Sequence, residues 1–471
     1  MIKVIQRPSI ILRDLVIDYE GSTNDDDIKY YVEQIGKYPY LQIGDTVIEI
    51  NNMIQTILYN NQFLPKIEVQ FRDPTNRLFD VLFPVDNEIL SLFIQSNSEI
   101  LMPIRMDFKI LDFNIIKNKE NEKNDLIYSI VGILNVNNLY FNSFSSYPNT
   151  SFEVLKKIAT DSELGFATNI DNTNDGMIWI NTGNTNLKFI QNVVSHSYLN
   201  DSTFMYAYID FYYNLNYVDI ESAINEDISD QTGILFSSNL TSNLNSDSQE
   251  TEMDLILTNH PDKLNSNNYI NKFNIINNST RVNLEIGYKS MLTYHDKNDN
   301  VIYKLLMDTI TTTGKNNDQV ILKGKVGEIS ELVENSIDYM NLGKVDTDNV
   351  HSNYLYAKQQ NIKNLNALQK IKVKVVINLM NFNLYRFQKI QLKFYKMDDI
   401  SITDDKPIKP TPEKVENYNG ENYDENRINK RLSGEWLITA INYTFNKVSG
   451  FSQEVTLVKR ELGFSDNDFN N

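Results

Sequence analysis

The feature that most constrains the fold is a pair of strand-like segments, Ser433 to Tyr443 and Phe451 to Leu462, separated by turn residues between Asn446 and Gly450. Side chains alternate between the two faces of a strand, and in the first segment both faces are mostly apolar. One face carries Leu437, Thr439, Ile441, Tyr443 and Phe445, and the other carries Trp436, Ile438, Ala440 and Asn442. The pattern predicts a β-hairpin whose first strand is buried on both sides, as in any all-β protein that closes with a hairpin.

Composition limits the possible classes of protein. A chain of 471 residues is long enough for about three domains, each with its own core. The 44 Lys and Arg residues are outnumbered by 62 Asp and Glu residues, which gives a formal net charge of −18. A chain this acidic repels phosphate backbones as a whole, so we expect no nucleic-acid-binding footprint.

The sequence contains no cysteine, which excludes a disulfide framework, thiolate metal sites and a cysteine nucleophile. It has no apolar run of the ~18 residues that a membrane-spanning helix needs. Residues 1–12 lack the features of a signal peptide. We therefore expect a soluble protein with no membrane partner.

Residues 1–145 are predicted to form a first tube-like β-barrel domain. Ile67, Val69 and Phe71 alternate with polar residues, and similar alternation recurs in the segments that follow. Several short strands at close spacing favour a closed or nearly closed barrel. The predicted strands include Val47 to Ile50, Phe79 to Phe83, Ile89 to Gln95, Ile104 to Phe113 and Leu126 to Val136.

Residues 146–222 are predicted to form a small α/β module. Ser151 is a good N-cap for a helix of about three turns, and Thr185 is a good N-cap for a second one. Residues 203–213 then alternate as a strand.

Residues 223–345 are predicted to form a second tube-like β-barrel domain with an exposed loop at 223–253. Residues 346–471 would complete this half as a C-terminal β region, with a helix over residues 354–368 and a flexible arm at 398–432. The fold class is thus mainly β with α+β insertions: two tube-like β-barrel domains, a small α/β module and a C-terminal β-hairpin region.

Few residues lie in patterns typical of a catalytic or metal-binding site. The four histidines, His196, His260, His295 and His351, form no zinc-protease arrangement, and we interpret them as surface or interface residues. Asp171 to Gly176 begins like a calcium loop, but Thr182 stands where the bidentate Glu is required, so we interpret it as an Asx-rich turn. Residues 296–300 similarly predict a hairpin turn. Trp179 and Trp436 lie in apolar strands and are predicted to pack in the core.

Phosphate-binding glycine loops and nucleophile elbows are absent from the sequence. We predict no catalytic, cofactor-binding or metal site, and no enzymatic activity.

Several runs of residues match a known family in order and spacing. These runs are residues 151–159, 164–169, 173–179 and 204–218 in the middle part, with Phe83 to Asp86, Pro103 to Phe108 and Ser433 to Leu462 in the flanking thirds. In these runs the sequence resembles the baseplate hub proteins of contractile-tailed (myovirus-type) bacteriophages. Residues 223–280 and 398–432 show no match.

The resemblance implies a structural subunit of the virion tail baseplate, assembled in the bacterial host cytoplasm. Its partners would be two further copies in a homotrimer, the tail tube protein, the central spike protein and other baseplate subunits. The ring would adapt a hexameric tube to a trimeric spike and line the DNA path, where an acidic wall would let DNA pass without binding.

Two alternatives remain open. One is the hub of a non-phage contractile injection machine, and the other is a receptor-binding or glycan-degrading virion protein, which needs an aromatic groove or a carboxylate pair.

Overall fold

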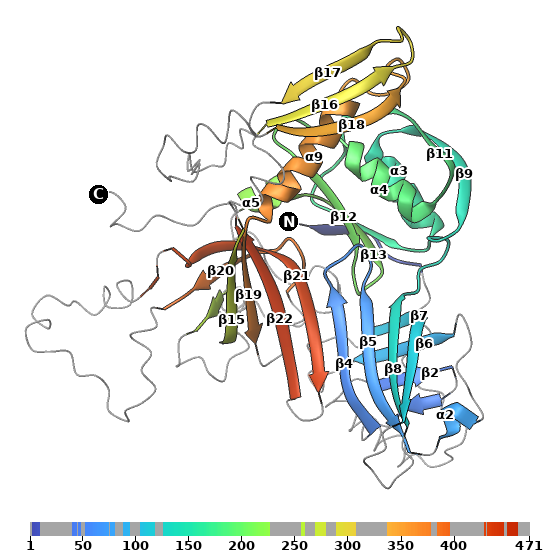
Figure 1. Ribbon diagram of the computed structural model, residues 1–471, viewed down its shortest axis with the longest axis vertical. Coiled ribbons are helices and arrows are strands. Elements are labelled where there is room, and N and C mark those ends of the chain that lie inside the picture. Colours follow the sequence, from blue (N-terminus) through green and yellow to red (C-terminus); the bar gives the residue numbers. More distant parts are fainter. Residues whose placement is uncertain are drawn as a thin grey trace, which may run out of the picture.

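The structure is a computed structural model of the 471-residue chain. It describes residues 2–9, 40–44, 46–48, 52–74, 76–80, 88–94, 104–117, 126–226, 256–259, 269–278, 289–307, 337–377, 384–395, 428–429, 431–446 and 450–459. Within this part the chain is mainly β with few helices, as predicted. Figure 1 shows a long sheet below and an α/β module above it.

One sheet of thirteen strands runs through the described residues of both halves of the chain. It joins strands from residues 40–134 to strands from residues 256–459. In spatial order the sheet contains β15 (Ile270–Asn277), β19 (Ile371–Ile377), β22 (Gly450–Lys459), β21 (Gly434–Asn446), β4 (Met53–Asn60), β5 (Lys66–Asp73), β8 (Leu126–Leu134), β7 (Ile104–Lys117), β6 (Ile89–Ile94), β2 (Tyr40–Ile43) and β3 (Thr46–Ile48), with β20 (Lys389–Lys393) on β21 and β14 (Ile256–Thr258) on β20. Among the described strands of this sheet, the pair β14–β20 is parallel and the others are antiparallel.

The two halves meet where β4 pairs with β21. The pairing is antiparallel from Ile441 opposite Asn60 to Asn446 opposite Gln55. Strands far apart in sequence therefore lie side by side at the centre of one sheet (Figure 1).

The predicted alternation in the first half is confirmed. Ile67, Val69 and Phe71 of β5 have no exposed surface, whereas Glu68 and Arg72 point outward. This period of two is what a sheet with one buried face requires.

The C-terminal hairpin is also confirmed, but its first strand contains an irregularity. The register between β21 and β22 shifts between Ile438 and Ala440. Such a bulge places one extra residue on the strand and switches the side-chain alternation. Trp436 and Ile438 are therefore buried before the shift, and Ile441, Tyr443 and Phe445 after it. Both faces are buried only at the start of the strand, and from Ile441 on the strand has one buried face.

The α/β module contains a four-stranded sheet, a strand pair and helices. The sheet has the order β1 (Lys3–Gln6), β10 (Gly165–Thr168), β13 (Asn214–Asp219) and β12 (Met205–Ile209), and the pair is β9 (Asn142–Asn149) with β11 (Met177–Thr185). The helices are α3 (Ser151–Asp161), α4 (Asn186–His196) and α5 (Ile220–Asn225). The N-terminal strand β1 thus joins this module, although we predicted residues 1–145 as one barrel domain.

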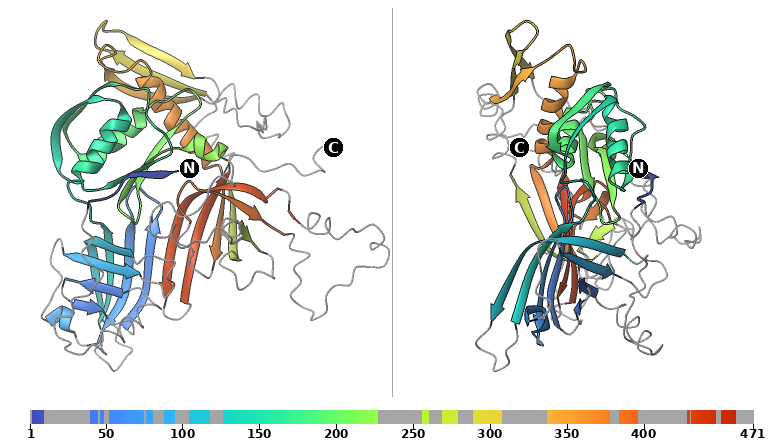
Figure 2. Two further views of the ribbon diagram at one scale, coloured as in Figure 1. Left: turned by 180° about the vertical axis from the view of Figure 1, so that it is seen from behind. Right: turned by 90° about the vertical axis from the view of Figure 1, so that its right-hand side faces the viewer.

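A further sheet of three strands lies beside α9. It contains β17 (Ile302–Met307), β16 (Lys289–Asp296) and β18 (Ile337–Val345). The helix that follows, α9 (Tyr354–Leu368), has the predicted bounds and packs against α4 of the module (Figure 2). The turn predicted at residues 296–300 is confirmed as the link between β16 and β17.

Two local predictions are wrong. The segment predicted as a strand from Phe79 to Phe83 begins inside a short helix, α2 (Arg77–Asp80), because the Asp73 carboxylate accepts a hydrogen bond from the Leu78 amide at 2.9 Å. The N-cap of α3 is Thr150, and Ser151 is the first residue of the helix.

Several predictions lie outside the described residues or remain untested. The strand ends at 49–50 and 81–83, the loop at 223–253 and the arm at 398–432 lie wholly or mostly outside the described residues. The division into domains and the closure of either half into a barrel stay predictions.

Candidate functional site

The best-defined site is the joint between the long sheet and the α/β module. Two clusters of polar side chains make this joint, one around Tyr213 and one around Arg386. These clusters fix how separate parts of the chain are placed relative to one another.

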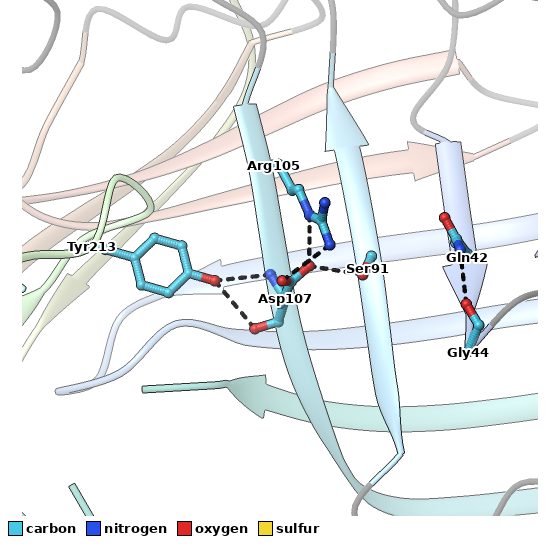
Figure 3. Close-up of polar contacts among 6 residues, drawn as sticks. All are labelled: Gln42, Gly44, Ser91, Arg105, Asp107 and Tyr213. Carbon is cyan, nitrogen blue, oxygen red and sulfur yellow. Dashed lines mark hydrogen bonds and ion pairs between the residues drawn. The ribbon is translucent and has the colours of Figure 1, made fainter. Parts of the chain in front are cut away.

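Tyr213 ties the module to strand β7. Its phenol oxygen accepts a hydrogen bond from the Asp107 amide at 2.9 Å and lies 3.4 Å from the Asp107 carbonyl oxygen (Figure 3). The ring itself is 1% exposed. A buried phenol that meets a backbone amide and carbonyl of another part of the chain fixes the distance between the two.

The Asp107 side chain is held on β7 by its neighbours. Its carboxylate accepts hydrogen bonds from Arg105 Nε at 3.0 Å and from Ser91 Oγ at 2.7 Å, the latter on β6 (Figure 3). Further along the same sheet, Gln42 Nε2 donates to the Gly44 carbonyl and closes the turn after β2. Asp107, which bonds to Tyr213, is therefore held by side chains from two strands, β6 and β7.

Asp210 holds Tyr213 in an unusual backbone conformation. Tyr213 has a φ of 60°, which non-glycine residues seldom adopt. The buried Asp210 carboxylate accepts hydrogen bonds from the Tyr212 and Asn214 amides, at 2.8 and 2.9 Å, and from Asn216 Nδ2 at 2.9 Å. Burial raises the pKa of Asp210 to about 6, and these donors oppose that rise.

Arg386 forms the second cluster and joins three segments. Its guanidinium is buried and donates from Nε to the Thr439 carbonyl at 2.8 Å, and from Nη1 to the Gln62 carbonyl at 2.6 Å. Nη2 donates to the Tyr206 hydroxyl at 3.2 Å. One side chain thus holds the β4–β5 turn, the module and strand β21 together.

The Arg386 charge is stabilised by aromatic rings as well as by these acceptors. The guanidinium carbon lies 4.4 Å from the centroid of the Tyr208 ring and 5.5 Å from that of Phe387. The Tyr208 hydroxyl returns a hydrogen bond to the Arg386 carbonyl at 3.1 Å. Because Thr439 lies at the bulge of β21, Arg386 also satisfies a carbonyl there.

Two further contacts join the module to the long sheet. The Ile209 amide donates to the Phe63 carbonyl at 2.7 Å, and the rings of Phe211 and Tyr443 lie 5.7 Å apart. Sequence reasoning missed Arg386 altogether. Tyr213 and Asp107 lie in runs that resemble hub proteins, but their contact joins positions 106 residues apart and leaves no local signal.

Two of the four histidines are not at the surface. His196 and His351 are 3% and 9% exposed, not surface residues. His196 stacks on Tyr354 with ring centroids 3.9 Å apart, and burial lowers its pKa to about 3. Burial also lowers the pKa of His351, whose ring lies 6.0 Å from Trp179. His295 is described in β16, and His260 lies outside the described residues.

The calcium-like segment has a structural role that agrees with its interpretation as a turn. The Asp175 carboxylate is fully buried and accepts hydrogen bonds from the Ser151 amide at 2.9 Å, from Thr173 Oγ1 at 2.7 Å and from the Tyr198 amide at 2.9 Å. It therefore caps α3 from 24 residues away. Over the residues that the structure describes, no group of three or more His, Asp or Glu side chains could hold a metal ion.

The prediction that both tryptophans pack in the core is confirmed, since Trp179 and Trp436 are each 1% exposed. No helix in the described ranges is long and apolar enough to span a membrane.

Comparison with known proteins supports the fold. No protein-family model and no curated protein matches the sequence. The 43 kDa tail protein of prophage MuSo2 from Shewanella oneidensis has a similar structure, with a TM-score of 0.51 and 8% identity over 90% of this chain and 98% of that one. A tail protein from Neisseria meningitidis MC58 matches with a TM-score of 0.48 and 11% identity, over 90% and 97% of the two chains.

A component of the type VI secretion system of E. coli, described as structurally similar to the T4 bacteriophage tail proteins gp27 and gp5, matches with a TM-score of 0.41 and 9% identity, over 90% and 77% of the chains. The resemblance to phage tail hub proteins inferred from the sequence is confirmed at the level of the fold. The chain has the fold of a phage tail protein.

Proposed function

We propose that the chain is a structural subunit of a phage tail baseplate hub. Three copies would form a ring that adapts the hexameric tail tube to a trimeric central spike and surrounds the path of the DNA. The sequence resemblance and the tail-protein fold support this assignment, and no step of it requires catalysis.

The observation that carries the proposal is the continuous sheet across the two halves of the chain. The wall of a tube needs sheets that run from one unit to the next without a gap. Within this chain the β4–β21 pairing already makes that connection, and Arg386, which donates to Gln62 beside β4 and to Thr439 on β21, holds it in place. Two such halves in each of three subunits give the six units that match a hexameric tube.

The two ends of the sheet lie on opposite sides of the subunit. The terminal strands of the long sheet are β15 and β3, and Figure 1 shows β15 and β2, the strand next to β3, at opposite sides. In a ring, each of these two sides would meet a neighbouring subunit. A cyclic ring uses such head-to-tail contacts. We expect each subunit contact to be of the permanent kind, roughly 2,000 Å² in total and largely apolar.

Stoichiometry with the partners tests this proposal. The chain should be co-expressed with the tube and spike proteins of the same tail, and the purified complex weighed by native mass spectrometry. We expect three copies of the chain for each spike trimer and for each tube hexamer. Failure to bind both partners, or one copy per spike trimer, would contradict the hub assignment.

The charge of the residues that line the bore of the ring tests the proposed DNA path separately. The net charge of −18 fits a wall that does not retain phosphates. An experimental structure of the ring whose bore is lined with Lys and Arg would contradict this part of the proposal.

A further inference from the structure

The outer face of the β9–β11 strand pair is apolar where a sheet face exposed to water is normally polar. In a sheet covered on one side, apolar residues face inward and polar residues outward. Here Phe144 is 86% exposed, Ile180 60% and Ile178 56%. Figures 1 and 2 show this pair at the outer flank of the module, away from α9.

These exposed side chains form one surface. In the register of the pair, Thr182 lies opposite Phe144, Ile180 opposite Ser146, and Ile178 opposite Pro148. Residues opposite each other, or two apart along neighbouring strands, share a face and lie within contact distance. We call the face made by Phe144, Ser146, Pro148, Ile178, Ile180 and Thr182 the outer β9–β11 face.

The inner face of the same pair is mixed. Ser143 Oγ accepts a hydrogen bond from Asn181 Nδ2 at 2.8 Å, and the Ser145 hydroxyl is buried without a hydrogen-bond partner. Trp179 packs inward, and the Tyr147 ring stacks on that of Phe189. The inner face is thus packed within the chain, whereas the outer face presents apolar side chains to water.

Phe144 lies against the neighbouring strand although it is exposed. Gly183, on that strand, has a φ of +95°, and a Cβ atom there would lie 2.8 Å from Phe144 Cζ. The phenyl ring thus contacts a glycine backbone and leaves most of its surface open to a second protein.

The surroundings of the face are uncharged. Residues 138–152 and 176–187, which contain both strands, have no Asp, Glu, Lys or Arg, although 23% of the whole chain is charged. Two copies of a chain with a net charge of −18 repel each other wherever acidic surfaces meet. A neutral, apolar face is where contact between copies meets least repulsion.

We infer that the outer β9–β11 face binds a second copy of this chain and forms part of the contact between neighbouring subunits. This inference rests on the proposed ring and adds one of its contact surfaces. At about 180 Å² for each fully exposed side chain of this size, the three apolar residues present roughly 350 Å². That is a substantial share of the ~800 Å² that each partner buries in a stable complex.

Light scattering of a double variant tests the inference. Phe144→Ser with Ile180→Thr removes two of the three exposed apolar side chains and keeps a β-branched residue on β11. Both side chains are exposed, so the far-UV circular dichroism spectrum of the variant should match that of the wild type. We expect the subunit dissociation constant to rise about 100-fold.

The matched control is Phe79→Ser with Ile302→Thr. It makes the same kind of exchange at exposed positions on α2 and β17, where the side chains are 49% and 66% exposed. The control should associate like the wild type. An equal loss of association in both variants would mean that surface apolarity in general drives assembly, and would overturn the assignment to this face.

The other outcomes separate the inference from the proposed function. A wild-type trimer with an equally stable trimer of the Phe144→Ser/Ile180→Thr variant would overturn the inference and leave the ring standing. A wild-type chain could also stay monomeric at about 100 μM, well above the dissociation constants of specific complexes. That result would overturn the inference. The proposed ring would then be tested by the stoichiometry of the complex with the spike protein.

Discussion

Replacing Arg386 by methionine tests whether one buried side chain holds the joint together. Methionine keeps most of the aliphatic volume and removes the charge and the donors. The hydrogen bonds to the Thr439 and Gln62 carbonyls are donated by a charged group, which makes each worth about 1.5–3 kcal/mol. The contact with the Tyr208 ring adds on the order of 1–2 kcal/mol.

The expected loss is smaller than the sum of these contributions. Gln62 is an exposed residue, and water can replace the donor to its carbonyl. We expect Arg386→Met to lower the free energy of unfolding by about 4 kcal/mol, and Arg386→Lys by about 2 kcal/mol, because an ammonium cannot reproduce the fork of donors.

Thermal unfolding followed by tryptophan fluorescence is a suitable assay. Trp179 reports on the module and Trp436 on the long sheet, and both are buried. Arg386→Met should lower the midpoint by on the order of 5–10 °C. It should also separate the transitions of the two parts, which single-tryptophan variants would resolve.

Arg72→Met, at an exposed position on β5, is the control and should change the midpoint by less than about 2 °C. If Arg386→Met unfolded within about 1 kcal/mol of the wild type, the assignment of the joint to Arg386 would be refuted.

Three further predictions concern the core and pH. Ile438→Asp should prevent folding or assembly, because it buries an unpaired charge in a position with no exposed surface. Ile438→Val should lower the free energy of unfolding by only about 1 kcal/mol. Soluble yield and ring formation measure both effects, and normal assembly of Ile438→Asp would contradict the burial. Tyr213→Phe should lower the free energy of unfolding by about 1–2 kcal/mol, read from urea denaturation, since it leaves the Asp107 amide without its phenol acceptor. His196 has a folded pKa of about 3 against an ordinary value of 6.5, so its stabilisation is complete above pH 6.5 and is lost as pH falls, by about 2 kcal/mol at pH 5. His196→Gln should weaken the loss of stability between pH 7 and 5, and an unchanged pH profile would count against the neutral, buried histidine.

Asp210 acts in the opposite sense to His196. Its pKa is raised to about 6, so the folded state binds a proton more readily than the unfolded state between about pH 4 and 6. The contribution of Asp210 therefore falls as pH rises through this range. The pH dependence of the wild-type free energy of unfolding is thus the difference between the His196 and Asp210 effects. The comparison with His196→Gln separates the two.

Local patterns in the sequence predicted the strands and helices well. The alternation of Ile67, Val69 and Phe71 predicted their burial, and Thr185 caps α4 as expected, accepting a hydrogen bond from the Lys188 amide. These features depend on neighbouring residues only. The pattern of the C-terminal hairpin was equally clear, apart from the bulge before Ala440, which depends on the partner strand.

Long-range contacts account for what the sequence did not predict. Arg386 is an ordinary basic residue until the fold places it against Thr439 and Gln62. The helix start at Ser151 depends on Asp175. His196 and His351 are buried because α9 packs against α4. Alternation also could not distinguish a face that is covered within the subunit from one that is exposed, as Phe144 shows.

Particle images of the purified wild-type chain test the central claim most directly. Electron microscopy of the chain, alone and mixed with its spike protein, reports both the number of subunits and the presence of a bore. The hub assignment predicts a three-subunit ring with an open centre, with six similar units around the wall. Single subunits in both samples, or a closed particle without a channel, would contradict it.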